Sequence, residues 1–189
     1  MTSSENPPFE LLILPGNHPG TGPWALDLGE ALARTFGNVW VRKWLHWDSG
    51  DDRIDVNAEL ERIDNSDWET VPTVLGKSAG VLVALRAIVT GILEPQRCIF
   101  IGTPLMFARS MGLDVPVLVH ALQRPTLFIQ QTDDPGGSFA TLSEALGGDA
   151  SAATPALVEV PGEDHRYDDV AALKTIIREW ARSTAPAEP

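Results

Sequence analysis

The feature of this sequence that most limits its fold is a regular alternation of short apolar runs with longer segments that have the spacing of amphipathic helices. The apolar runs are rich in leucine, β-branched and aromatic residues, and glycine or proline lies near their ends. Such runs are typical of strands that are buried on both faces of a parallel sheet. The chain has six of them, at residues 9–14, 39–41, 70–75, 98–102, 126–130 and 157–160.

The segments between these runs carry helical periodicity. In residues 24–36 an apolar side chain recurs at every fourth position from Leu28 to Phe36, and similar spacing follows Ser78 and recurs near the end of the chain. Strands that alternate with helices form right-handed βαβ units. The pattern therefore predicts a three-layer α/β fold, in which about six helices cover both faces of a mostly parallel sheet of about six strands.

Length and charge narrow the possibilities further. With 189 residues, we expect one domain over residues 9–181, with tails at residues 1–8 and 182–189. The formal net charge of −12 would repel polyanions, so we expect neither nucleic acid nor an anionic membrane as a partner. No apolar run approaches the roughly 20 residues of a membrane span. The first residues lack the basic and apolar regions of a secretory signal, which favours a cytoplasmic location.

The single cysteine, Cys98, lies in one of the apolar runs. One cysteine excludes an internal disulfide and a cysteine-based metal cluster. A buried thiol in apolar surroundings is inert, so we expect Cys98 to be a core residue.

The segment Gly76-Lys77-Ser78-Ala79-Gly80 lies between a predicted strand and a predicted helix. A serine can attack a carbonyl group only when its hydroxyl is held exposed, and small residues two positions before and after it allow the necessary sharp turn. We therefore interpret the segment as a nucleophile elbow with Ser78 as the nucleophile. A phosphate-binding P-loop also ends in Gly-Lys-Ser, but it needs an earlier glycine where this chain has Val71, inside the predicted strand.

A nucleophilic serine needs a base, and the base needs a group that orients it. In α/β serine hydrolases these residues follow in the order serine, acid, histidine. Asp133 and Asp134 follow the fifth apolar run, and His165 follows the sixth, whereas the other three histidines do not fit this order. Because parallel strands end at one edge of the sheet, these groups should converge there. The alternatives are that the aspartates only cap a helix and that His165 is solvated.

The negative charge that develops on an attacked carbonyl oxygen needs two N–H donors. One is expected from the residue after the nucleophile, here Ala79, and the other from the loop after the first strand, where we favour Asn17 over His18. His18 and Lys77 are further candidates to line the pocket. Lys77 could bind a substrate carboxylate, pair with an acidic residue of the protein or point to water.

One further motif favours a different function. Residues Gly20-Thr21-Gly22-Pro23-Trp24-Ala25 formally match the dinucleotide fingerprint G-x-G-x-x-A. However, the match begins six residues after Leu14, and the second strand leads into Arg42 and Lys43 instead of an acidic residue. Basic residues there could still contact an NADP phosphate, so a nucleotide-binding α/β enzyme remains the weaker alternative.

Together these residues resemble the small, lidless α/β-hydrolases that include retinoblastoma-binding protein nine and its bacterial relatives. The resemblance covers nearly the whole chain and rests on Pro15-Gly16-Asn17, the elbow at Ser78, Thr132-Asp133-Asp134-Pro135 and the Gly-x-x-His ending at His165. In that family the acid is the second aspartate before proline, which selects Asp134. The resemblance also implies that the first strands of larger hydrolases are missing and that no cap domain is inserted. Lys77 departs from the family pattern, which usually has histidine or another neutral residue there.

The sequence thus predicts a serine hydrolase that cleaves an ester-like or other activated acyl bond of a small molecule. We expect the reaction to use Ser78, His165 and Asp134, with no cofactor and no metal. The alternative from another class is a protein-binding module that keeps the hydrolase fold without turnover. An exposed group among the tryptophans of the first half of the chain would favour that alternative, because exposed aromatic clusters mark binding surfaces (Trp24, Trp40, Trp44, Trp47 and Trp68).

Overall fold

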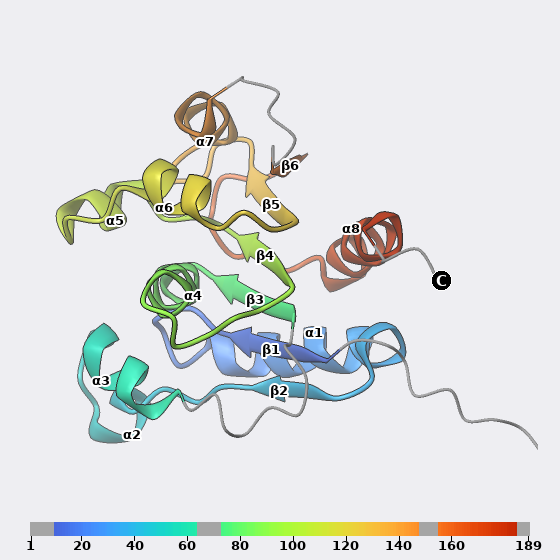
Figure 1. The fold of residues 1–189 in the computed structure, drawn as a ribbon. Helices are drawn as coiled ribbons and strands as arrows, with labels where there is room; N and C mark the ends of the chain where they lie inside the picture. Colours follow the sequence, from blue (N-terminus) through green and yellow to red (C-terminus); the bar gives the residue numbers. More distant parts are fainter. Residues whose placement is uncertain (1–9, 64–72, 148–154, 185–189) are drawn as a thin grey trace, which may run out of the picture.

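The computed structural model describes residues 10–63, 73–147 and 155–184. Within these ranges the chain forms one sheet of six parallel strands in the order β2-β1-β3-β4-β5-β6 (Figure 1). The predicted fold class is therefore confirmed. The strands are β1 (Leu11–Leu14), β2 (Val39–Val41), β3 (Thr73–Lys77), β4 (Arg97–Ile101), β5 (Thr126–Gln131) and β6 (Ala156–Val160).

Helices cover both faces of this sheet. On one face, α1 (Thr21–Phe36) packs against α8 (Val170–Ser183). On the other face α3, α4, α6 and α7 are successive neighbours, while α2 and α5 follow the carboxyl ends of β2 and β4 (Figure 1). Their bounds are α2 (His46–Ser49), α3 (Val56–Arg62), α4 (Ala79–Val89), α5 (Leu105–Ser110), α6 (Val115–Ala121) and α7 (Phe139–Leu146).

The core consists of two apolar layers, one on each side of the sheet. Successive side chains of a strand point to opposite faces. In β3, Val74 therefore packs in the layer under α4, whereas Leu75 packs in the layer under α1 and α8. Phe100 and Ile101 of β4 divide between the layers in the same way. Because the central strands are buried on both faces, their sequences are continuously apolar instead of alternating.

Some predicted boundaries differ from the structure. The third strand continues to Lys77, and α8 continues to Ser183, two residues beyond the predicted domain end at residue 181. Ala181 is buried and its carbonyl accepts a hydrogen bond from Arg97, which holds the last turn of α8 in place. Eight helices lie within the described ranges instead of about six, since single-turn helices such as α2 are too short to show periodicity. The predicted tail at residues 1–8 lies outside the described residues.

No helix in the described ranges combines the length and the apolar character that crossing a membrane would require. Cys98 is buried in β4, and its burial raises the pKa of the thiol to about 12. This placement agrees with a core residue and not with a reactive thiol.

The closest backbone approach around the elbow occurs at Gly80, in the first turn of α4. A Cβ atom on this residue would lie 1.9 Å from the carbonyl oxygen of Leu14 and 2.6 Å from that of Pro15. A Cβ on Gly76 would lie 2.8 Å from backbone atoms of Gly80. Only glycine at these two positions lets α4 begin directly against the end of β1, so the Gly-x-x-x-Gly frame of the elbow is a packing requirement.

Gly80→Ala is expected to lower the free energy of unfolding by about 3 kcal/mol or more, because the opposing atoms are backbone and cannot rotate away. Chemical denaturation monitored by circular dichroism measures this change. Gly20→Ala is the matched control: Gly20 has helical backbone angles, and its Cβ would meet only the movable His18 side chain. Equal stability of the two variants would contradict the role assigned to Gly80.

Candidate active site

Ser78 lies at the turn between β3 and α4, at the carboxyl edge of the sheet. Its backbone angles, φ 53° and ψ −118°, are rare for a residue with a side chain. The turn is held because the Ser78 N–H donates to the carbonyl of Ile101 at 3.0 Å, and the Gly80 contact fixes the following helix. Such strain is tolerated where surrounding structure determines the conformation, and it is found at functional sites.

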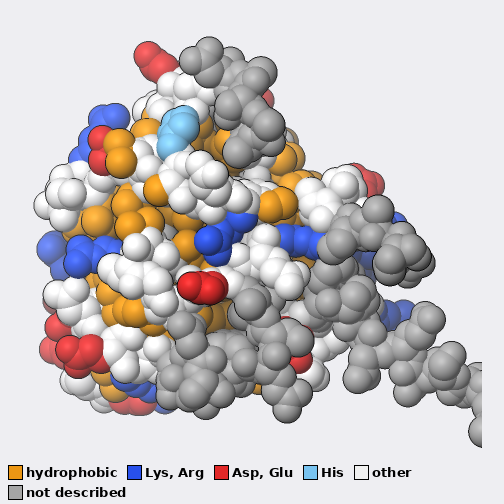
Figure 2. All heavy atoms as spheres, viewed as in Figure 1, with side chains coloured by type: hydrophobic (Ala, Val, Ile, Leu, Met, Phe, Trp, Pro, Cys, Tyr) orange, Lys and Arg blue, Asp and Glu red, His pale blue; other side chains and the backbone are white. Residues whose placement is uncertain are grey.

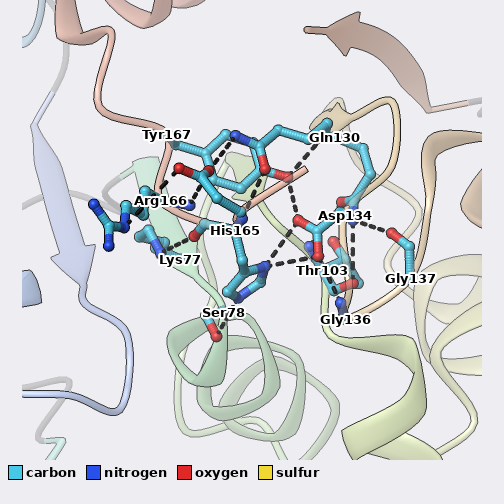
Figure 3. Close-up of polar contacts among 12 residues, drawn as sticks. Lys77, Ser78, Thr103, Gln130, Asp134, Gly136, Gly137, His165, Arg166 and Tyr167 are labelled. Atoms are coloured by element: carbon cyan, nitrogen blue, oxygen red, sulfur yellow. Dashed lines mark hydrogen bonds and ion pairs between the residues drawn. The ribbon is translucent and has the colours of Figure 1, made fainter. Parts of the chain in front are cut away.

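His165 bridges Ser78 and Asp134 (Figure 3). Its Nδ1 lies 2.8 Å from both carboxylate oxygens of Asp134, and its Nε2 lies 2.8 Å from the Ser78 hydroxyl oxygen. A carboxylate can only accept, so the imidazole carries its proton on Nδ1 and donates to Asp134. In the neutral imidazole with this tautomer, Nε2 accepts the hydrogen of the serine hydroxyl. This arrangement has the geometry that a nucleophile, its base and an orienting acid require.

The structure distinguishes the two adjacent aspartates. Asp134 is 3% exposed and faces His165, whereas the Asp133 side chain is exposed. The Asp133 N–H donates to the carbonyl of Gly162 in the loop after β6. Asp134 is held further by the N–H of Gly136 at 2.7 Å. The turn that carries Asp134 is thus tied both to its own backbone and to the histidine loop.

Tyr167 is a residue of this site that the sequence reasoning missed. Its hydroxyl donates to Asp134 Oδ2 at 2.6 Å and accepts from the backbone N–H of Gln131 at 2.8 Å. The side chain is 4% exposed, and burial together with the Asp134 carboxylate raises the pKa of its phenol. The available signal was weak: Tyr167 is the one tyrosine of the sequence and lies two residues after His165.

The surroundings of Asp134 favour its charged form. Burial by itself would raise the pKa of this carboxyl, but hydrogen bonds from His165, Tyr167 and Gly136 outweigh it and hold the pKa below its ordinary value. The acid therefore stays ionised at neutral pH, as a group that orients an imidazole must.

The backbone of His165 is clamped as well. The side chain of Gln131 accepts a hydrogen bond from the His165 N–H at 2.8 Å, and the same amide donates to Asp164 at 3.1 Å. The preceding residue of β5, the buried Gln130, accepts from the N–H of Thr103 and donates to the carbonyl of Gly137 (Figure 3). Two consecutive glutamines at the end of β5 thereby fix the loops around His165 and Asp134.

The loop after β1 lies against the nucleophile, since a Cβ on Gly16 would be 3.6 Å from that of Ser78. The carbonyl of Asn17 accepts from His46 Nε2 at 2.7 Å and from Trp47 Nε1 at 2.8 Å. The Asn17 side chain is also engaged, accepting from the N–H of Ile54 and donating to the carbonyl of Asp52.

These contacts engage the carbonyl and the side chain of Asn17 but not its backbone N–H. No described residue accepts a hydrogen bond from it or from the N–H of Ala79, at the first position of α4. Both predicted oxyanion donors are therefore N–H groups that the described part of the chain leaves without an acceptor. The roles of His46 and Trp47 in holding this loop were not foreseen, because nothing in the sequence links residues about 30 positions apart.

The two predicted pocket residues differ in their surroundings. His18 is exposed, and its Nδ1 accepts from the N–H of Gly20, so its contact is local to the turn before α1. Lys77 is 3% exposed and donates to the carbonyl of His165 at 3.1 Å. As the last residue of β3, Lys77 shares its face with Leu75, the face under α1 and α8, and this alternation turns it away from α4. Its burial and its hydrogen bond to His165 thus place Lys77 in the protein interior and not in open water.

Among residues 10–63, 73–147 and 155–184, no group of three or more His, Cys, Asp or Glu side chains is arranged to hold a metal ion.

Tyr167→Phe should lower the free energy of unfolding by about 1–3 kcal/mol at neutral pH, because the buried N–H of Gln131 loses its acceptor and Asp134 loses a donor. Since the folded state lowers the pKa of Asp134, its contribution to stability is present at neutral pH and disappears as the pH falls through the folded-state pKa. The difference between parent and variant should therefore shrink on acidification. Denaturation at a series of pH values measures it, and a difference that grows in acid would contradict this account.

Comparison with known proteins shows similarity at the level of structure. No family model matches the sequence, and no curated protein does. A dienelactone hydrolase from Anabaena variabilis has 18% identity and a TM-score of 0.66, covering 94% of this chain and 87% of that one. The esterase domain of a Rhodothermus marinus protein has 18% identity and a TM-score of 0.63, with 97% and 90% covered. An α/β serine hydrolase without a lid from Xanthomonas campestris has 20% identity and a TM-score of 0.63, with 100% and 88% covered. The chain therefore has the α/β-hydrolase fold in a minimal form, similar to that of the Xanthomonas campestris hydrolase without a lid.

Proposed function

We propose that this protein is a serine hydrolase that cleaves ester-like or other activated acyl bonds of small molecules. The observation that carries the proposal is the continuous set of hydrogen bonds from Ser78 through His165 to Asp134 at the carboxyl edge of the sheet. Ligands of open α/β sheets bind at this edge. The names of similar structures, which include an esterase domain and a dienelactone hydrolase, support carboxylic esters as the first substrate class to test.

The proposed reaction has two halves. In the first, the Ser78 oxygen attacks the acyl carbon while His165 Nε2 takes the hydroxyl proton, and Asp134 stabilises the resulting imidazolium. The N–H groups of Ala79 and Asn17 stabilise the negative oxygen of the tetrahedral intermediate. His165 then gives its proton to the leaving alcohol as the carbon–oxygen bond breaks. In the second half, water attacks the acyl carbon while His165 takes its proton. His165 returns this proton to the Ser78 oxygen as the bond between that oxygen and the acyl carbon breaks, and the acid product leaves.

The protein-binding alternative is less well supported. Trp44 is fully buried, and its indole N–H donates to the carbonyls of Pro15 and Gly16. Trp40 is 38% exposed, and Trp68 lies outside the described residues. On the face in Figure 2, hydrophobic side chains are interspersed with charged and neutral groups. Two of the described tryptophans, Trp44 and Trp47, thus hold the loop beside Ser78 through their indole N–H groups.

The nucleotide-binding alternative is also disfavoured. A Cβ on Gly22 would lie 3.2 Å from the Trp47 ring, so this indole fills the space next to the second glycine of the formal fingerprint. The P-loop reading fails as well, because Lys77 is buried beneath the His165 loop instead of reaching over the start of α4.

Ser78→Ala should reduce kcat/KM for short activated esters, such as p-nitrophenyl acetate, by a factor of at least about 10³, because the nucleophile is lost. A fluorophosphonate probe should label the parent covalently and leave Ser78→Ala unlabelled. Circular dichroism verifies that the variant is folded. Hydrolysis by the folded variant at the parent's rate would contradict the proposal.

The adjacent aspartates offer a matched pair for testing the acid. Asp134→Asn should lower kcat by up to about 10⁴-fold, because an amide next to the imidazole no longer favours the required tautomer and cannot stabilise the imidazolium. Asp133→Asn makes the same chemical change at an exposed position and should stay within about twofold of the parent. Equal losses in both variants would refute the assignment of Asp134.

A further inference from the structure

We propose that Lys77 is a positioning residue, which holds the backbone of His165 through its ammonium group and thereby keeps the imidazole aligned with Ser78. This inference rests on the proposed hydrolase function. It gives a role within the site to the elbow residue that the sequence suggested as a substrate contact.

The location of Lys77 links the nucleophile directly to the base. Lys77 immediately precedes Ser78, and its Nζ donates to the carbonyl oxygen of His165 at 3.1 Å (Figure 3). The backbone N–H of His165 donates to the side chain of Gln131. Side chains from two different strands therefore hold both polar backbone groups of His165, one from β3 and one from β5.

The histidine loop has a backbone conformation that needs such support. His165 and Tyr167 have φ values of 62° and 63°, in the left-handed region that side-chain-bearing residues rarely adopt. Conformations of this kind persist only when neighbouring groups determine them. The Lys77 hydrogen bond acts on His165 itself, so its removal should change the imidazole position more than the fold.

Two aromatic rings enclose the ammonium group. Lys77 Nζ lies 5.6 Å from the centre of the Trp24 ring and 5.7 Å from that of Tyr167, within the range of cation–π attraction. The Trp24 indole N–H also donates to the carbonyl of Tyr167 at 2.9 Å. The enclosure thus joins α1, β3 and the histidine loop, and its rings favour a cation over a neutral side chain.

The charged groups facing Lys77 come from two loops. Asp134 comes from the loop after β5, and Asp164 and Asp168 come from the loop after β6 that also carries His165 and Tyr167. From α1 the residue in contact is the uncharged Trp24. Burial lowers the pKa of Lys77 to about 8, although the three carboxylates act in the opposite direction and raise it. Lys77 is therefore charged at neutral pH and loses its proton as the pH rises through about 8.

This titration predicts a distinctive dependence of activity on pH. Below about pH 8 the ammonium is present and holds the His165 carbonyl. Above that pH the neutral amine loses the attraction of both rings and donates a weaker hydrogen bond. The kcat of the parent should therefore fall as the pH rises through this range.

The experiment compares the parent with Lys77→Met and Lys77→Gln, using Lys43→Met as the control because Lys43 is exposed. Methionine fills the enclosure without donating, and glutamine donates without charge. With p-nitrophenyl acetate, kcat in Lys77→Met should fall about 10- to 100-fold at pH 7 with KM almost unchanged, as expected for a misplaced base. Lys77→Gln should recover part of kcat. Both variants should lack the decline near pH 8, and Lys43→Met should match the parent.

A second readout does not depend on turnover. The proton on His165 Nδ1 should give a downfield NMR resonance in the parent, because it is held against Asp134. The proposal expects this resonance to broaden or disappear in folded Lys77→Met. It is overturned if the resonance and the rate profile of that variant match those of the parent. If the parent hydrolyses no ester, the proposed function fails, and the resonance alone still decides whether Lys77 positions His165.

Discussion

The site depends on one steric constraint, the contact between the start of α4 and the end of β1. Because Gly80 has no side chain, the helix begins directly against the carbonyls of Leu14 and Pro15. This contact brings the first amides of α4 to the loop that follows β1, and it holds Ser78 in its unusual conformation between them. The nucleophile and both candidate oxyanion donors thus derive their relative positions from the absence of a single methyl group.

The sequence predicted well what depends on local pattern and chain order. Periodicity revealed the strands because a parallel sheet buried on both faces leaves continuous apolar runs. The ends of those runs pointed to Ser78, to the pair Asp133 and Asp134, and to His165. The choice between Asp133 and Asp134 came only from the resemblance to a family. Local pattern cannot distinguish two adjacent carboxylates that differ only in which one a fold buries.

The features that the sequence could not predict are contacts between distant segments. Trp24 donates to the carbonyl of Tyr167 across 143 positions, and Lys77 donates to that of His165 across 88. From the sequence, Lys77 could equally contact a substrate, an acidic residue or water, whereas strand alternation directs it to the layer opposite α4. In an acidic protein, a lysine that is enclosed by rings and faced by carboxylates is as much part of the fold as of the site.

The position of β6 has a consequence for how the protein responds to heat. This strand lies at the edge of the sheet, and its side chains are only partly buried, unlike those of β3, β4 and β5. Regions with fewer buried contacts open first in native proteins. Since the loop after β6 carries His165, the base is attached to an edge strand, whereas Ser78 is attached to the centre of the sheet. Gentle warming should therefore separate the two reversibly while most of the tertiary structure persists, so that activity is lost at a lower temperature than cooperative melting.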